Sequence, residues 1–278
     1  MVRMQTTEHE FRGRHGESIV YQVHRPEKPR AVVVIAHGMG EHGGRYGHVV
    51  ARLVDAGFLV AVPDHLGHGK SGGKRMQLSS FADFTDDLGK VFADVAVGSL
   101  PTFLLGHSMG GCIALDYALD HQDQLDGLIL SGAAVKPGDD LSPIAIRAAK
   151  ILGRVAPGLP TTGLPVDKIS RDPDVVAAYK ADPLVTVSKI PAGLAAAMLS
   201  TMQSFPGRLP SLHIPVLVLH GGDDALTDPA GSQLVEDLAG SSDKTLIIYD
   251  GLYHEIFNEP EQDKVLTDVV DWISARVG

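Results

Sequence analysis

The sequence has few of the features that mark secreted, membrane-spanning or nucleic-acid-binding proteins. Its one cysteine, Cys112, excludes an internal disulfide bond and a metal site built from cysteines. Acidic residues outnumber basic ones by 34 to 24, and a net charge of −10 does not suit nucleic-acid binding. No apolar run approaches the roughly 18 residues of a membrane span. Residues 1–17 hold no apolar segment of a signal peptide. We therefore expect a cytoplasmic protein, with peripheral membrane contact left open.

Short apolar runs alternate with amphipathic segments along most of the 278 residues. Residues 18–24 stop before Pro26, which predicts an edge strand. Strands that alternate with helices predict an α/β fold, in which a mostly parallel central sheet carries helices on both faces. The other predicted strands are 31–37, 58–63, 102–107, 128–131, 215–220 and 245–249, and the predicted helices are 46–56, 81–97, 109–121, 229–239 and 262–277.

The alternation stops between residues 134 and 209, where prolines are frequent. Two apolar segments in this stretch, 144–152 and 192–202, predict helices. We interpret the stretch as a helical insertion between two strands of the sheet. The chain then divides into a first part of the core at 1–133, the insertion at 134–209 and a second part of the core at 210–278.

Two segments match G-x-S-x-G, the pattern of a sharp strand-to-helix turn that exposes a nucleophilic serine. Residues 106–110 follow the apolar run TFLL and precede the apolar segment CIALDYAL, which predicts such a turn with Ser108 at its tip. Residues 69–73 have neither neighbour, so we interpret them as an ordinary turn. Ser108 alone would also suit a helix N-cap. Its assignment as a nucleophile therefore needs a base and an orienting acid.

Two later strand ends supply these groups. Asp224 comes soon after one predicted strand and His254 soon after the next. We expect both to project from the carboxyl edge of the sheet, where Ser108 also lies. The chain order Ser–Asp–His is the order of α/β-hydrolases. Asp223 is the alternative orienting acid, and we interpret the more distant Asp228 as the cap of the following helix.

A third glycine pattern favours a different class of protein. Residues 38–43 read G-x-G-x-x-G between a strand and a helix, and Asp64 follows at the end of the next strand, as in dinucleotide-binding proteins. Glu41, however, would lie where a pyrophosphate must approach. Asp64 with His65 and His68 could suggest a metal site, but no zinc-type spacing follows. We interpret these residues as hydrogen-bonding loop residues and expect no metal and no organic cofactor.

Together these motifs resemble those of the monoacylglycerol lipase group of the α/β-hydrolase family. The resemblance implies the α/β-hydrolase fold with a helical cap at 134–209. It also implies hydrolysis of monoacylglycerol to glycerol and a fatty acid through an acyl-enzyme on Ser108. The motifs that carry it are H-G-M-G-E-H at 37–42, R-Y at 45–46, D-H-L-G-H-G at 64–69, G-H-S-M-G at 106–110 and Y-H at 253–254.

The resemblance also assigns roles to individual residues. Met39 and Met109 would give the backbone N–H groups of an oxyanion hole. Glu41 and Arg45 match positions near the glycerol head group of the substrate. Phe257 stands where some members of the group carry a polar residue near that head group.

Other functions stay open at this point. A lysophospholipase or a general short-chain carboxylesterase would use the same serine chemistry. A non-catalytic receptor on a hydrolase scaffold is the alternative from a different class. The apolar cap helices could touch a lipid surface or form a dimer face, and the oligomeric state is left undetermined. We expect Cys112 to pack as a small apolar residue and His37 and His107 to serve as scaffold.

Overall fold

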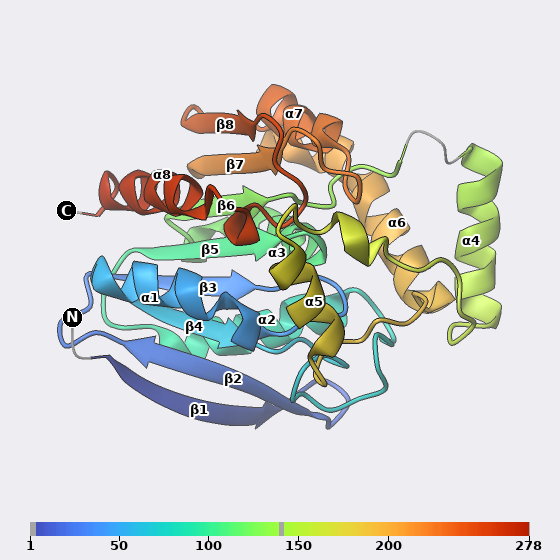
Figure 1. Cartoon of the computed structure of the whole chain (residues 1–278), viewed down its shortest axis with the longest axis horizontal. Helices are drawn as coiled ribbons and strands as arrows, with labels where there is room; N and C mark the ends of the chain where they lie inside the picture. Colours follow the sequence, from blue (N-terminus) through green and yellow to red (C-terminus); the bar gives the residue numbers. More distant parts are fainter. Residues whose placement is uncertain (1–3, 139–141, 278) are drawn as a thin grey trace.

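An eight-stranded sheet runs through the molecule (Figure 1). The computed structural model describes residues 4–138 and 142–277. The strand order is β1-β2-β4-β3-β5-β6-β7-β8, with β2 antiparallel to both of its neighbours and the other pairs parallel. This arrangement confirms the predicted α/β fold. The strands are β1 (Gln5–Arg12), β2 (Ser18–Arg25), β3 (Ala31–Ala36), β4 (Phe58–Pro63), β5 (Thr102–His107), β6 (Gly127–Ser131), β7 (Val216–Gly221) and β8 (Lys244–Tyr249).

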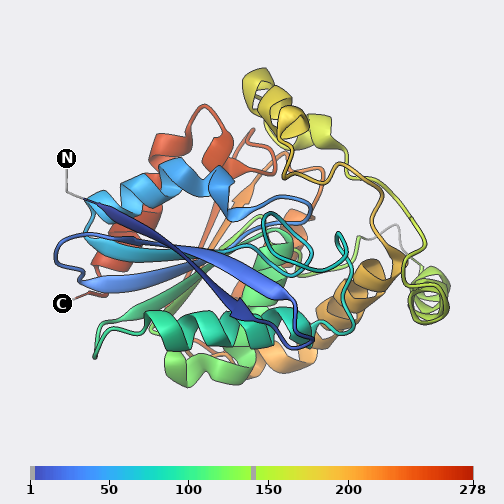
Figure 2. The same cartoon turned by 90° about the horizontal axis from the view of Figure 1, so that it is seen from below.

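Helices cover both faces of the sheet, with α1 and α8 on one face and α2 and α3 on the other (Figure 2). Parallel strands covered on both faces must be apolar throughout, and β3 and β4 are buried at every residue. The helices of the core are α1 (Gly47–Asp55), α2 (Ala82–Val95), α3 (Met109–His121), α7 (Pro229–Leu238) and α8 (Gln262–Ser274), with 3₁₀ turns η1 (Gly43–Tyr46), η2 (Gln122–Gln124) and η5 (Ile256–Asn258).

The prediction that residues 18–24 form an edge strand was wrong. The edge is β1, which pairs with β2 along its whole length, from Gln5 opposite Arg25 to Arg12 opposite Ser18. The sequence QTTEHEFR of β1 is exposed at almost every residue, so it carries no apolar periodicity from which a strand could be predicted.

The segment between β6 and β7 contains the helices that extend beyond the sheet (Figure 1). We propose that it is the cap, with the bounds 134–209. Its helix α6 continues through Pro206, beyond the predicted end at residue 202, and α5 was not predicted. No helix in the described ranges is both long and apolar enough to cross a bilayer. The elements are α4 (Pro143–Val155), η3 (Val166–Lys168), α5 (Pro173–Ala181), α6 (Ala192–Arg208) and η4 (Leu209–Ser211).

Candidate active site

Ser108 lies at a sharp turn between the end of β5 and the start of α3. Its backbone has φ 55° and ψ −119°, a conformation that costs an L-residue roughly 1–3 kcal/mol. Two glycines make the turn possible. A Cβ on Gly106 would lie 2.3 Å from the carbonyl oxygen of Gly110, and a Cβ on Gly110 would lie 2.0 Å from that of Ala36. The motif therefore adopts the predicted strand–turn–helix geometry.

Asp224 and His254 meet in the loops that follow β7 and β8. His254 Nδ1 lies 2.7 Å from Asp224 Oδ2, and the Asp224 side chain is fully buried. The other carboxylate oxygen accepts the backbone N–H groups of Leu226 and Thr227 at 2.8 and 3.1 Å. Burial opposes the charge, but the electrostatic effect of the neighbouring His254 and hydrogen bonds from His220 and His254 hold the pKa of Asp224 well below its usual range. Asp224 is therefore an ionised carboxylate aimed at the imidazole.

The two other aspartates of this region lie elsewhere. Asp223 is exposed, and its backbone N–H binds the carbonyl oxygen of Leu252. Asp228 is the N-cap of α7, where its side chain accepts the N–H of Ala230 at 2.8 Å, as predicted. Of the three acids, the structure brings Asp224 to His254.

His254 lies close to the turn that carries Ser108. The imidazole of His107, the residue before Ser108, has its centroid 4.7 Å from that of His254. Gly132 follows β6, the strand that pairs with β5, and a Cβ on Gly132 would lie 3.3 Å from His254 Nδ1. Because Nδ1 faces Asp224, Nε2 is the ring nitrogen left for Ser108. In the described ranges the Ser108 hydroxyl makes no hydrogen bond to this ring; such contacts often tighten only when substrate binds.

A glycine-rich loop, residues 38–42, borders Ser108 on the other side. A Cβ on Gly38 would lie 3.3 Å from Ser108 Cβ. His37 Nε2 accepts the N–H of His65 at 3.0 Å, so its Nδ1 carries the proton and donates to the Gly38 carbonyl at 2.8 Å. The Glu41 carboxylate accepts the Gly38 N–H at 2.6 Å. Across a trans peptide the C=O and N–H point in opposite directions. The hydrogen bond from His37 to the Gly38 carbonyl therefore also sets the direction of the Met39 N–H, which belongs to the same peptide group.

Met109 offers a second N–H beside Ser108. It is the first residue of α3, and N–H groups of a first helical turn have no partner inside the helix. The helix dipole adds partial positive charge at this end. Met109 directly follows Ser108, and Met39 follows Gly38, the loop residue that lies against Ser108; their role as oxyanion donors stays a prediction.

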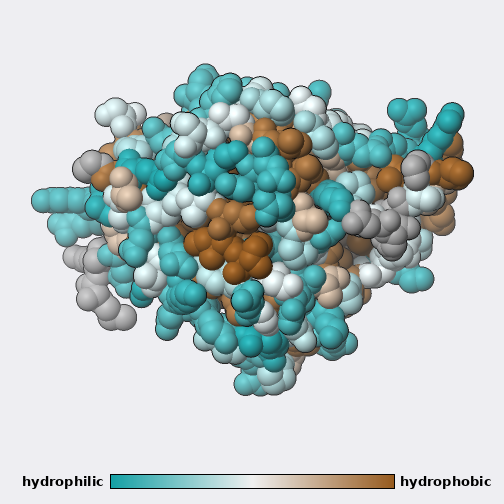
Figure 3. Space-filling model, turned by 90° about the horizontal axis from the view of Figure 1, so that it is seen from above, coloured by the Kyte–Doolittle hydropathy of each residue, from teal (hydrophilic) through white to brown (hydrophobic). Residues whose placement is uncertain are grey.

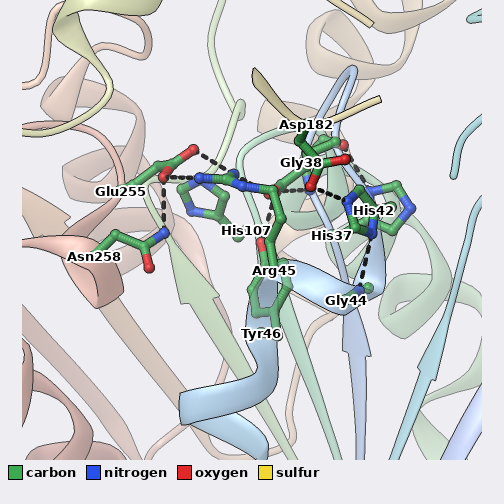
Figure 4. Close-up of polar contacts among 12 residues, drawn as sticks. His37, Gly38, His42, Gly44, Arg45, Tyr46, His107, Asp182, Glu255 and Asn258 are labelled. Carbon is green, nitrogen blue, oxygen red and sulfur yellow. Dashed lines mark hydrogen bonds and ion pairs between the residues drawn. The ribbon is translucent and has the colours of Figure 1, made fainter. Parts of the chain in front are cut away.

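Glu41 and Arg45 belong to a buried ionic network (Figure 4). Arg45 Nη1 lies 2.5 Å from Glu41, and the guanidinium binds both oxygens of Glu255 at 2.7 Å. Tyr46 donates its hydroxyl proton to Glu41 at 2.7 Å. Burial opposes ionisation, yet Arg45 and two neighbouring histidines lower the pKa of Glu41 to about 2. Glu41 and Arg45, which were predicted near the head group of the substrate, therefore form a charged support beneath the loop. Glu255 belongs to the same ionic network, and no sequence motif indicated it.

The second G-x-S-x-G segment has no free hydroxyl. Ser71 is buried, donates to the backbone carbonyl of Asp64 at 2.6 Å and accepts the N–H of Val20 at 2.9 Å. The carboxylate of Asp64 accepts backbone N–H groups of Gly43 and Lys70 at 2.8 and 2.7 Å. Asp64 therefore holds neighbouring loops together, as the sequence indicated.

Three histidines pack under the loop. His65 and His68 are buried with their rings near His37 and Phe84. Burial and the nearby His37 lower the pKa of His68 to about 3 and that of His65 well below its usual value. Both rings are therefore neutral near pH 7 and pack against their neighbours, and His68 Nδ1 also bonds the Leu66 carbonyl oxygen at 2.9 Å, as predicted for a hydrogen-bonding loop residue.

Two further predictions concern packing residues. Cys112 is fully buried in the apolar layer around α3, and burial raises the pKa of its thiol well above its usual value, so it packs as predicted. The side chain of Phe257 is buried in the apolar layer of α1 and α8. The Phe257 side chain therefore faces the core of this chain.

The fold and the strained serine define the class: this is an α/β-hydrolase with a serine at the nucleophile turn. A family model described as "Serine aminopeptidase, S33" matches residues 27–261. The chain belongs to this family of serine hydrolases.

The similar proteins include several lipases. The chain is 48% identical to the "Monoacylglycerol lipase" of Mycolicibacterium smegmatis over 100% of both proteins. It is 35% identical to the human "Monoglyceride lipase" over 89% of this chain and 84% of that protein. Among solved structures, the monoacylglycerol lipase of Paleococcus ferrophilus superposes with a TM-score of 0.83 at 31% identity, covering 98% of this chain and 99% of the other.

Proposed function

We propose that this chain is a monoacylglycerol lipase that releases glycerol and a fatty acid through an acyl-enzyme on Ser108. The observation that carries the chemistry is the 2.7 Å contact of Asp224 with His254 beside a serine held at φ 55°. The substrate class is supported by the relatives, of which one with that name is 48% identical over the full length.

Acylation begins when Ser108 Oγ attacks the ester carbonyl carbon. His254 Nε2 takes the hydroxyl proton, while Asp224 holds the ring in the required tautomer and stabilises the imidazolium. The tetrahedral intermediate collapses, the bond from carbon to the glycerol oxygen breaks, and His254 returns the proton to that oxygen. Glycerol leaves, and the acyl group stays on Ser108.

Deacylation repeats the same steps with water. His254 removes a proton from the water as it attacks the acyl carbon, and the fatty acid leaves as Ser108 regains its proton. In both halves the N–H groups of Met39 and Met109 stabilise the oxyanion. Loss of one such donor typically costs about 10²–10³ in rate. This chemistry uses the protein's own groups and water.

We propose that Glu41 and Arg45 act on the glycerol end of the substrate chiefly by holding the loop at 38–42 that borders it. Glu41 binds the Gly38 N–H, and Arg45 fixes Glu41 against Glu255. Their polar atoms are thereby engaged with the protein, and 11% of the Arg45 side chain is exposed.

We further propose that the cap touches a lipid surface through α4. Its outer face carries apolar side chains that are largely exposed: Ile144 at 82%, Ile151 at 54% and Val155 at 74%. Their spacing of seven and four residues puts them on one stripe of the helix. Figure 3 shows apolar side chains gathered at the end of the molecule that α4 occupies.

Basic residues flank this stripe. Arg147, Lys150 and Arg154 all lie on α4, and the helix has no acidic residue, although the whole chain carries a net charge of −10. A helix with an apolar stripe and a basic border is typical of attachment to anionic lipid surfaces. The double variant Ile151→Asp/Val155→Asp should lose sedimentation with anionic vesicles and keep its activity on a dissolved short ester. Equal sedimentation of variant and parent would contradict the lipid contact.

A substrate panel tests the function. Purified protein is assayed on monoacylglycerols of increasing chain length, lysophospholipids, triacylglycerols and short p-nitrophenyl esters, each beside Ser108→Ala. We expect the highest kcat/KM on a monoacylglycerol and no turnover by Ser108→Ala with an unchanged thermal melt. A higher kcat/KM on lysophospholipids or only on short esters would replace the proposed substrate class by one of those alternatives.

A further inference from the structure

The loop at 38–42 is bound from outside by the cap. The Gly40 carbonyl accepts the N–H of Thr186 at 2.7 Å. His42 Nε2 lies 2.9 Å from Asp182 Oδ2. Both contacts join the segment that follows α5 to the loop beside Ser108, and Figure 4 shows Asp182 above His42.

The contact between His42 and Asp182 has a defined direction. His42 Nδ1 accepts the N–H of Gly44 at 3.1 Å, so the ring proton is on Nε2 and is donated to Asp182. The second oxygen of Asp182 accepts the N–H of Leu184 at 2.8 Å. Asp182 thus ties its own turn of the cap to His42 with one oxygen for each partner.

Gly40 fits closely beneath this segment. Its φ is +74°, and a Cβ there would lie 2.9 Å from the Thr186 carbonyl oxygen and 3.5 Å from the Tyr179 hydroxyl. Nearby, the Arg45 guanidinium lies over the Tyr179 ring at 4.5 Å from its centroid. A glycine has wide conformational freedom, so an external hydrogen bond is needed to keep its peptide in one orientation.

The two ends of the loop are therefore held by different parts of the molecule. On the core side, His37 and Glu41 fix the peptide groups of Gly38. On the outer side, the cap binds the Gly40 carbonyl through the Thr186 N–H and the His42 Nε2–H through Asp182, while Nδ1 of the same ring accepts the N–H of Gly44. Met39, whose N–H is the proposed oxyanion donor, lies between these two points.

We propose that Asp182 and Thr186 are positioning residues for the ester hydrolysis: they hold the loop so that the Met39 N–H faces the oxyanion. This inference rests on the proposed serine-hydrolase function. It also sets one segment of the cap apart from the rest. The segment from Tyr179 to Thr186 stays seated on the loop during turnover and forms part of the oxyanion hole's frame. It is not a lid that swings away.

The variant Asp182→Asn tests this assignment. The asparagine oxygen can still accept the N–H of Leu184. The amide nitrogen then faces the Nε2–H of His42, so two hydrogen-bond donors point at each other. The other His42 tautomer would place a proton against the N–H of Gly44. The matched control is Asp167→Asn, also on the cap, whose side chain is 80% exposed and pairs only with Lys180 in the described ranges.

The assay uses p-nitrophenyl acetate, whose acyl group is too short to need a long apolar channel, with active sites counted by fluorophosphonate titration. For Asp182→Asn we expect kcat per titrated site to fall roughly tenfold, part of the 10²–10³ that loss of a whole donor costs, with KM within twofold. Affinity for a trifluoromethyl ketone, whose adduct places an oxyanion in the hole, should fall by the same factor. Asp167→Asn should match the parent protein in all three values.

A purely structural role gives a different pattern. If Asp182→Asn lowers the melting temperature or the titrated fraction but keeps kcat per site and ketone affinity, the positioning role is refuted. Gly40→Ala, which pushes on Thr186 from the loop side, should reproduce the loss of kcat and ketone affinity, and unchanged values would refute it as well. Failure of the proposed function is distinguishable, because then the parent protein itself would not turn over the ester.

Discussion

The replacement of Asp224 by asparagine tests the orienting acid with a change of one atom. In the parent protein His254 donates from Nδ1 to Asp224 Oδ2 at 2.7 Å, which leaves Nε2 without a proton and able to act as a base. The other carboxylate oxygen accepts two backbone N–H groups, from Leu226 and Thr227. An asparagine must keep its oxygen at these two donors, so its NH₂ group is directed to His254.

The expected loss follows from this forced orientation. His254 would accept the amide proton at Nδ1 and carry its own proton on Nε2, the tautomer that cannot take a proton from Ser108. A serine hydrolase in that state loses about 10⁴ in kcat. At 1.36 kcal/mol for each factor of ten, the barrier rises by about 5 kcal/mol.

The assay is kcat for a short p-nitrophenyl ester, with the thermal melt as the measure of folding. Asp223→Asn is the matched control, because it makes the same chemical change one residue away at an exposed side chain. It should keep the activity of the parent protein. A loss below tenfold for Asp224→Asn, or an equal loss for both variants, would refute the assignment of Asp224.

Three other changes probe the frame of the site. Gly110→Ala should fail to accumulate as folded protein in a soluble-expression and melting assay, because its Cβ would lie 2.0 Å from the Ala36 carbonyl oxygen; a normal melt would contradict the close packing. Arg45→Met should lower the free energy of unfolding in urea by about 3–5 kcal/mol, since its two carboxylate partners would stay buried without a counter-charge; a change below 1 kcal/mol would contradict it. The pKa of His68 is lowered to about 3 by burial and by His37, so the unfolded chain binds the extra proton below its ordinary value near 6.5. The free energy of unfolding should therefore decrease as the pH is lowered from 6.5 to about 3. His68→Gln should reduce the slope of this free energy against pH by up to about 1.4 kcal/mol per pH unit; an unchanged slope would contradict this.

The core of the fold could be predicted because its strands are buried on both faces. The predicted strand 58–63 coincides with β4, since every residue in it is apolar or buried. The elements that were missed depend on long-range contacts. β1 is polar and exists because β2 offers it a partner, and α5 is a short helix among prolines that is seated by contacts around Tyr179. α6 extends past Pro206, although a proline inside a helix removes a backbone donor and crowds the carbonyl four residues before it, so the sequence pattern predicted an earlier end.

The candidate site divides in the same way. Ser108, Asp224 and His254 could be predicted because each directly follows or lies near a strand end, and parallel strands end at one edge. The supports could not be predicted. Glu255 lies next to His254 in the sequence, but its partner Arg45 is 210 residues away. The contacts of the cap with the loop at 38–42 likewise join segments with no pattern in common.

Fluorophosphonate labelling shows directly whether Ser108 is the nucleophile. The intact protein is treated with the probe, its mass is measured, and the modified peptide is sequenced, with Ser108→Ala treated in parallel. We expect one adduct per chain, on Ser108, and none on the variant. An unmodified parent protein, or an adduct on another residue that Ser108→Ala retains, would contradict it.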